Sequence, residues 1–308
     1  MKNFDEVYQT LVSRVDTQKL NEIRQKELKR TTFTVIAILA LIAFAFIGFA
    51  SENDLFSTLF VVGLILFFVY LVYLIINSFK NRKTSNSYKN LFKDEVMENL
   101  VNTYDSGLHF DRTQSISRQE YNQGQFEFYE IYHSNDLIVG DLNGSTFIKM
   151  GDVLTQNEST DSDGNTTYYT VFSGLFCKCN LSKDTRNTLK VRADKGIFGK
   201  NKSQVNMDSQ EFEKNFDVYS SDKVLAMRLL TSDIMDFMIN FKKENKIRFD
   251  FSIINDVAYI RIHCSDLFES HLSKDPLDQN ILLKYYNYLH FMCKLCSMIT
   301  DVINEKDI

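Results

Sequence analysis

Two pairs of cysteines have a spacing that suits metal ligands or redox-active thiols. One residue separates Cys177 from Cys179, and two residues separate Cys293 from Cys296. Four thiolates in such pairs are able to hold a tetrahedral Zn²⁺ ion. The first pair, however, alternates along a predicted strand, and the second lies within a predicted helix rather than in a zinc knuckle. We therefore interpret all four as buried packing residues and predict neither a metal site nor a cofactor.

A second group with chemical potential is the run His263, Cys264, Ser265 and Asp266, which contains a base and two types of nucleophile. Neighbours along a strand point to opposite faces, so these residues do not form a catalytic triad by themselves. Nucleotide-binding glycine loops, the hydrolase nucleophile elbow and the zinc-protease motif are all absent from the sequence. We predict no catalytic residues and favour a protein that is not an enzyme.

The segment from Ser159 to Thr170 resembles a calcium-binding loop because it contains Asp161-Ser162-Asp163-Gly164. Ser159 and Thr170 nevertheless occupy the first and last ligand positions, and the last position requires a bidentate Glu. We therefore predict an ordinary hairpin loop at this segment.

The elements that position these residues follow from the spacing of apolar side chains. From Gln125 onward the period becomes two, which predicts short antiparallel strands with tight turns at Asn143-Gly144 and Asn255-Asp256. Residues 156–166 and 195–204 are polar and are predicted to be exposed loops. Helices are expected at 222–230, at 232–243 and from Asp275-Pro276 to near the end of the chain. The predicted fold class is α+β, a mostly antiparallel sheet with packed helices.

Two apolar runs without charged side chains precede this region, at 31–51 and 55–79. Each is long enough, as a helix, to cross a hydrocarbon core of about 30 Å. We therefore predict a transmembrane hairpin with the lipid bilayer as one partner. Basic residues flank the hairpin on both outer sides, and by the positive-inside rule they place both termini in the cytoplasm. The expected location is the cell membrane, spanned twice.

The predicted organisation has four parts: an amphipathic N-terminal helix at 1–30, the hairpin at 31–79, a juxtamembrane helix at 80–110 and a cytoplasmic α+β domain at 111–308. The net charge is −5, with +3 in the first 83 residues and −8 in the remainder. An acidic domain argues against a nucleic-acid partner, which requires a basic surface. The five cysteines are an odd number and do not suggest a disulfide framework.

Several short segments resemble a family of uncharacterised bacterial membrane proteins that join a two-span hairpin to a C-terminal domain of unknown function. The most specific are Phe172-Ser173-Gly174-Leu175-Phe176 and the run from Phe212 to Asp222; Tyr88–Lys93 and Asp136–Gly140 also match. The resemblance implies the two-part architecture and no activity. Cys177 and Cys179 depart from the family pattern, where apolar residues are expected, and this supports a packing role.

The leading hypothesis is a non-enzymatic accessory or scaffold protein of the membrane whose cytoplasmic domain binds a membrane or cytosolic protein. The alternative is a membrane-anchored enzyme or ligand sensor with a site assembled from distant residues, for which His263, Cys264 and the two glycine-bearing loops are the candidates. A concave polar pocket with a perturbed titratable group favours the alternative, whereas an exposed apolar patch or a bare sheet edge favours protein binding. The sequence leaves the oligomeric state open.

Overall fold

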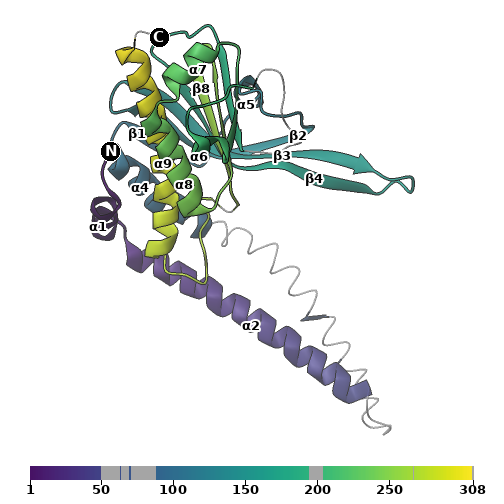
Figure 1. Cartoon of the computed structure of the whole chain (residues 1–308). Coiled ribbons are helices and arrows are strands. Elements are labelled where there is room, and N and C mark those ends of the chain that lie inside the picture. Colours follow the sequence, from purple (N-terminus) through teal and green to yellow (C-terminus); the bar gives the residue numbers. More distant parts are fainter. Residues whose placement is uncertain (50–62, 64–68, 71–87, 194–203, 266, 307–308) are drawn as a thin grey trace. The chain divides into compact units, whose positions relative to one another are not determined.

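The eight described strands form one antiparallel sheet with the order β1-β2-β3-β4-β8-β7-β5-β6 in a computed structural model (Figure 1). The structure describes residues 1–49, 63, 69–70, 88–193, 204–265 and 267–306. The strands are β1 (Leu108–Asp111), β2 (Ile131–Leu142), β3 (Thr146–Thr160), β4 (Thr166–Asn180), β5 (Thr188–Ala193), β6 (Phe216–Ser220), β7 (Phe249–Ile254) and β8 (Val257–His263). The predicted α+β class with an antiparallel sheet is therefore correct for this part of the chain.

One face of the sheet is apolar and is covered by helices. Leu189, Val191, Phe251 and Ile260 of β5, β7 and β8 are completely buried. The ring of Phe249 lies 4.7 Å from that of Phe291 in α9 (Gln279–Glu305), and α8 (Ser232–Asn245) packs beside it. Burial of one such aromatic side chain stabilises the fold by about 1.5–3 kcal/mol. The remaining short helices of the C-terminal half are α6 (Gln210–Glu213) and α7 (Lys223–Leu229).

The opposite face carries a second, mixed core under α5 (Arg118–Gln123). Ser117 caps this helix, since its hydroxyl accepts from the Glu120 N–H while the Glu120 carboxylate accepts from the Ser117 N–H. Tyr121 of α5 then packs on Phe172 and Phe176 of β4. This face therefore combines aromatic packing with the polar residues described below.

Both predicted tight turns are confirmed. Asn143 and Gly144 have positive φ angles of 52° and 69°, as a two-residue hairpin requires, and Asn255 has 58°. The predicted loop at 156–166 is wrong at its ends, because β3 continues to Thr160 and β4 begins at Thr166. The polar composition hid two strands that have solvent on both faces. The last helix begins at Gln279, four residues later than Asp275.

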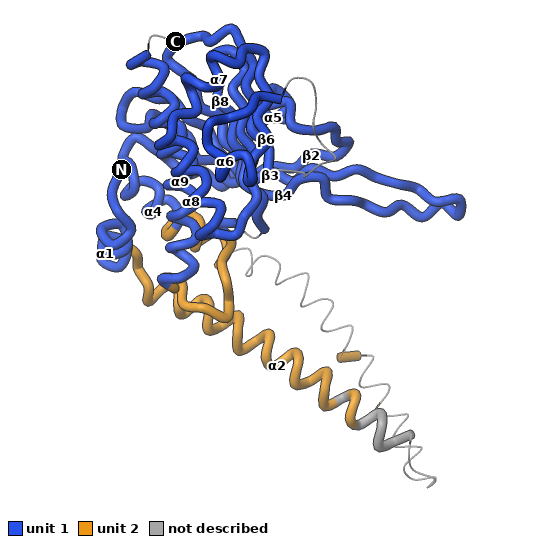
Figure 2. The backbone as a smooth tube through the Cα atoms, viewed as in Figure 1, with its two compact units in different colours: residues 1–13, 97–268, 279–308 blue, residues 14–96, 269–278 orange. Residues whose placement is uncertain are grey.

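The chain divides into two compact units (Figure 2). Unit 1 consists of residues 1–13, 97–268 and 279–308 and contains the sheet and most of α1 (Phe4–Arg14); unit 2 consists of residues 14–96 and 269–278. Within unit 2, α2 (Thr17–Phe49) buries Leu20, residues 88–92 form a helical segment, and the Lys93 ammonium lies 2.7 Å from the Glu269 carboxylate. The boundaries drawn from sequence at residues 30, 79 and 110 stay a prediction.

The described residues include no helix with both the length and the apolar character needed to cross a membrane. This finding contradicts the predicted transmembrane hairpin and, with it, the two-span integral membrane protein of the cell membrane. The run at 31–51 is not a separate helix, because its residues up to Phe49 continue α2. The first half of this helix carries charged side chains, among them Lys19, Arg24 and Lys26. Most of the run at 55–79 lies outside the described residues.

The expected helix at 80–110 is shorter than predicted. Residues 80–87 lie outside the described part of the chain, a π-helical turn η1 (Lys93–Met97) interrupts the helix, and α4 (Glu98–Tyr104) ends it. Strand β1 follows from Leu108, which the helical spacing of the preceding apolar residues did not predict.

Candidate functional site

A row of alternating charges crosses four strands on the mixed face of the sheet. Arg192 of β5 lies opposite Asp217 of β6, and Asp250 of β7 lies opposite Arg261 of β8. Val191 of β5 pairs with Phe251 of β7. Because the two strands are antiparallel, the residue after Val191, which is Arg192, lies beside the residue before Phe251, which is Asp250. Directly opposite residues share a face of the sheet, and unlike charges at such positions attract. We call Asp217, Arg192, Asp250 and Arg261 the charge ladder.

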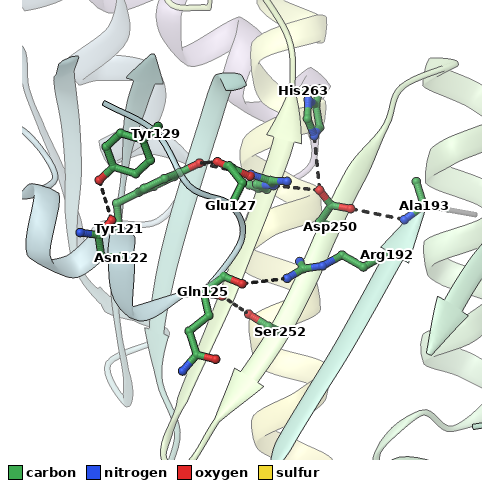
Figure 3. A network of polar contacts seen from close by, with 12 residues as sticks. Tyr121, Asn122, Gln125, Glu127, Tyr129, Arg192, Ala193, Asp250, Ser252 and His263 are labelled. Atoms are coloured by element: carbon green, nitrogen blue, oxygen red, sulfur yellow. Dashed lines mark hydrogen bonds and ion pairs between the residues drawn. The ribbon is translucent and has the colours of Figure 1, made fainter. Parts of the chain in front are cut away.

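Asp250 is the centre of the ladder and has no exposed surface. Its Oδ2 atom is 2.8 Å from Arg261 Nε and 3.3 Å from His263 Nε2, and its Oδ1 atom accepts from the Ala193 N–H at 3.3 Å (Figure 3). Burial opposes ionisation of this carboxyl. The hydrogen bond from His263 and the guanidinium groups of Arg261 and Arg192 outweigh burial and hold the pKa of Asp250 well below its usual value.

Arg261 is enclosed by partners on every side that the structure describes. Its guanidinium contacts the Glu127 carboxylate, lies 3.2 Å from the Tyr121 hydroxyl and sits over the ring of Phe126 at 4.4 Å. Burial opposes its charge, but Asp250 and Glu127 together raise the pKa of Arg261, which therefore stays protonated. Asp250 and Arg261 are thus paired with each other and with His263 and Glu127, whereas the buried Nη1 atom of Arg192 has no hydrogen-bond partner among the described residues.

The residues suggested by sequence as a base and a nucleophile do not cooperate. His263 is 25% exposed and is directed at Asp250 through Nε2. The Cys264 thiol donates to the Ile262 carbonyl, and burial raises the pKa of Cys264 to about 12, so it is protonated and unreactive at neutral pH. Asp266 lies outside the described residues. The geometry pairs His263 with the Asp250 carboxylate, while the Cys264 thiol is directed at the Ile262 carbonyl instead.

The structure does bring the four remaining cysteines together. Cys177 and Cys179 of β4 and Cys293 and Cys296 of α9 are buried, and Cys296 lies near enough to both strand cysteines to influence their pKa values. We call these four the thiol cluster. Burial raises the pKa of Cys293, which disfavours the thiolate that binds metals. Among the described residues, no group of three or more His, Cys, Asp or Glu side chains has an arrangement that fits a metal ion.

The other feature of this unit is a two-stranded ribbon, residues 156–170, that projects beyond the sheet (Figures 1 and 2). Pairing of β2 with β3 ends at Gln156, and pairing of β4 with β8 begins at Gly174. A β-bulge between Thr155 and Gln156 marks the base of the ribbon. Among the described residues, no other strand pairs with the ribbon beyond Gln156.

The unpaired edge of β4 can be assigned from the hydrogen bonds of the ribbon. The Asp161 N–H donates to the Asn165 carbonyl at 3.0 Å, and bonded pairs alternate with non-bonded pairs in an antiparallel ladder. Thr166, Tyr168 and Thr170 are therefore in non-bonded pairs, so their N–H and C=O groups point away from β3. The β3 edge is partly closed, since the Glu130 carboxylate accepts from the Glu158 N–H at 2.7 Å.

The side chains of the ribbon are acidic and aromatic. Glu158, Asp161 and Asp163 are exposed, and no Lys or Arg occurs between Lys149 and Lys178. Tyr168 and Tyr169 are 55% and 57% exposed and, as neighbours in a strand, lie on opposite faces. The Asp161 carboxylate accepts from the N–H groups of Asp163 and Asn165, so this residue shapes the turn. The segment is a hairpin, as predicted, and not a twelve-residue calcium loop.

Part of this chain is similar to a family of unknown function. Residues 170–300 match the family described as "Protein of unknown function (DUF3137)", and the ribbon lies almost entirely before this match. No curated protein matches the chain. The crystal structure of the mycobacterial trehalose monomycolate transport factor A, TtfA, is similar with a TM-score of 0.35 and 8% identity, over 63% of this chain and 86% of that chain. A likeness this distant carries no argument about function.

Proposed function

We propose that this protein binds an extended segment of another polypeptide along the β4 edge of the ribbon. The observation that carries the proposal is the row of outward N–H and C=O groups at Thr166, Tyr168 and Thr170. An open edge of this kind is a template for an added strand, and main-chain hydrogen bonds to it supply affinity in many peptide-binding domains. Pairing of β8 with β4 ends at His263. The added strand pairs with β4 beyond that point, in line with β8.

The ribbon itself gives a reason for a partner. A two-stranded hairpin with solvent on both faces is at best marginally stable in water, and a third strand adds hydrogen bonds and side-chain contacts. The two exposed tyrosines suit such a contact, because a tyrosine supplies a large area at a small loss of conformational entropy.

The test blocks the outward hydrogen bonds and keeps those between β3 and β4. In the double variant Thr166→Pro and Thr170→Pro, each proline removes an N–H that points away from β3, which an edge strand tolerates. The matched control, Thr166→Val and Thr170→Val, keeps both N–H groups. Binding of labelled decapeptides that alternate Thr with Gln, Lys or Glu is followed by fluorescence anisotropy, and circular dichroism confirms that both variants are folded.

Saturable binding of at least one of these peptides to the native protein and to the valine variant, with loss in the proline variant, supports the proposal. If no peptide binds, the acidic side chains of the ribbon serve to protect the edge from aggregation, and the proposal is wrong. Equal binding to the proline variant also contradicts it, because the peptide then uses another surface.

A further inference from the structure

The side chains of the ribbon define the chemistry of a partner strand more closely than its edge does. Glu158 of β3 lies directly opposite Tyr168 of β4 in a non-bonded pair. Side chains in such pairs share one face, with Cβ atoms about 4.5–5.5 Å apart. A carboxylate beside an exposed aromatic ring is suited to a cation, which is attracted by the negative charge and by the face of the ring.

We infer that the strand bound by the ribbon is basic and places a Lys or Arg side chain against Tyr168 and Glu158. This inference rests on the proposed function. A strand paired with β4 lies about 4.8 Å from it, so a residue opposite Tyr168 is its direct neighbour on the same face. A long basic side chain then crosses the ring of Tyr168 and brings its charge to the Glu158 carboxylate.

The charge of the whole ribbon favours the same partner. Asp163 at the turn adds to Glu158 and Asp161, and no basic side chain of the ribbon offsets them. A second copy of the chain that paired its β4 edge with this one would bring no cation to Glu158, because neither Lys nor Arg occurs in the ribbon. A basic segment of a different protein therefore fits this surface better than a second copy does.

The experiment compares the same three peptides. All three have Thr at the same alternate positions, and they differ in charge because Gln, Lys or Glu stands between the Thr residues. At about 50 mM salt we expect the Thr-Lys peptide to bind about tenfold more tightly than the Thr-Gln peptide, and the Thr-Glu peptide to bind most weakly. At about 500 mM salt the difference narrows, because the charges of the ribbon are exposed and screened.

Two variants locate the preference. Glu158→Gln and Tyr168→Leu each reduce the preference for Lys over Gln to about threefold. Two controls keep it in full: Glu244→Gln removes an exposed carboxylate of α8, and Tyr169→Leu removes the tyrosine on the other face of the ribbon.

The outcomes separate the inference from the proposed function. Equal affinity for all three peptides, with binding still lost in the proline variant, overturns the basic partner and leaves strand binding in place. A preference for Lys that survives both variants arises elsewhere on this acidic protein, and the inference is then wrong. Sedimentation that detects self-association lost in the proline variant identifies a second copy as the occupant and overturns the inference as well. Absence of binding by every peptide refutes the function itself.

Discussion

Replacement of Asp250 by Asn tests the charge ladder most directly. The change keeps the shape of the side chain and removes a charge that has no exposed surface and that contacts Arg261 and His263. Removal of one partner from a buried ion pair costs about 3–5 kcal/mol, because the remaining charge is left without compensation. Glu127 still neutralises Arg261 in part, so we expect a loss at the lower end, about 3 kcal/mol.

Urea unfolding followed by circular dichroism measures this loss. The midpoint of the variant should fall while the slope m stays unchanged, since the surface exposed on unfolding is the same. The control is Glu244→Gln on α8, an exposed carboxylate whose loss should stay within about 0.5 kcal/mol. A loss below about 1 kcal/mol for Asp250→Asn would show that the buried carboxylate gains nothing from its partners.

The same pair of proteins predicts a pH dependence. The partners of Asp250 lower its pKa in the folded protein, so its contribution to stability is complete above the ordinary aspartate pKa of about 3.9 and declines as the pH falls toward the folded value. The difference in unfolding free energy between native protein and Asp250→Asn should therefore be at its full value near pH 5 and shrink below about pH 4. A difference that grows as the pH falls below about 5 contradicts the assigned direction of the pKa shift.

Three further predictions concern other sites. The Tyr88 hydroxyl is buried and has no hydrogen-bond partner among the described residues, so Tyr88→Phe should leave the unfolding free energy unchanged or raise it by up to about 1 kcal/mol, and a clear loss would contradict this. Gly174 has φ +153°, and an added Cβ would lie 1.9 Å from the Ile262 carbonyl oxygen. Gly174→Ala should therefore lower the unfolding free energy by about 3 kcal/mol or more. Gly144→Ala, whose added Cβ meets no atom within 4 Å, should lower it by about 1 kcal/mol in the same assay. The thiol cluster is expected to carry no metal, so elemental analysis of chelator-washed protein should find no zinc, and one equivalent would establish a structural metal site.

Sequence reasoning located features that depend on near neighbours. The turn at Asn255-Asp256 is determined by a few residues, and it was predicted correctly. That turn also fixes the register of its two strands, which places Asp250 opposite Arg261. The central ion pair was therefore available from the sequence, and an acidic residue in the run from Phe249 to Ile254, which is apolar apart from Asp250 and Ser252, was the signal.

Other features depend on pairings between distant segments. Arg192 meets Asp250 because β5 inserts between β6 and β7, and no local pattern specifies this order. The thiol cluster likewise requires α9 to lie against β4, so cysteines more than a hundred residues apart become neighbours. The strand ends at 156–160 and at Thr166 were predicted to be loop for a different reason: both of their faces are in solvent, so they lack the alternation of apolar and polar residues by which strands are recognised.

The turn and the β-bulge of the ribbon determine two different properties of it. The turn at Asp161–Asn165 determines which side chains of the ribbon face one another, and thus the chemistry of its two faces. The extra residue in β4 at the bulge bends and twists the strand, and thus determines the direction in which the ribbon projects. Deletion of Val171 would change the direction of the ribbon and keep its facing residues, whereas a new turn sequence would change the facing residues and keep the direction. The direction of the ribbon and the side chains that it presents are therefore determined by different residues, which are free to change independently among related proteins.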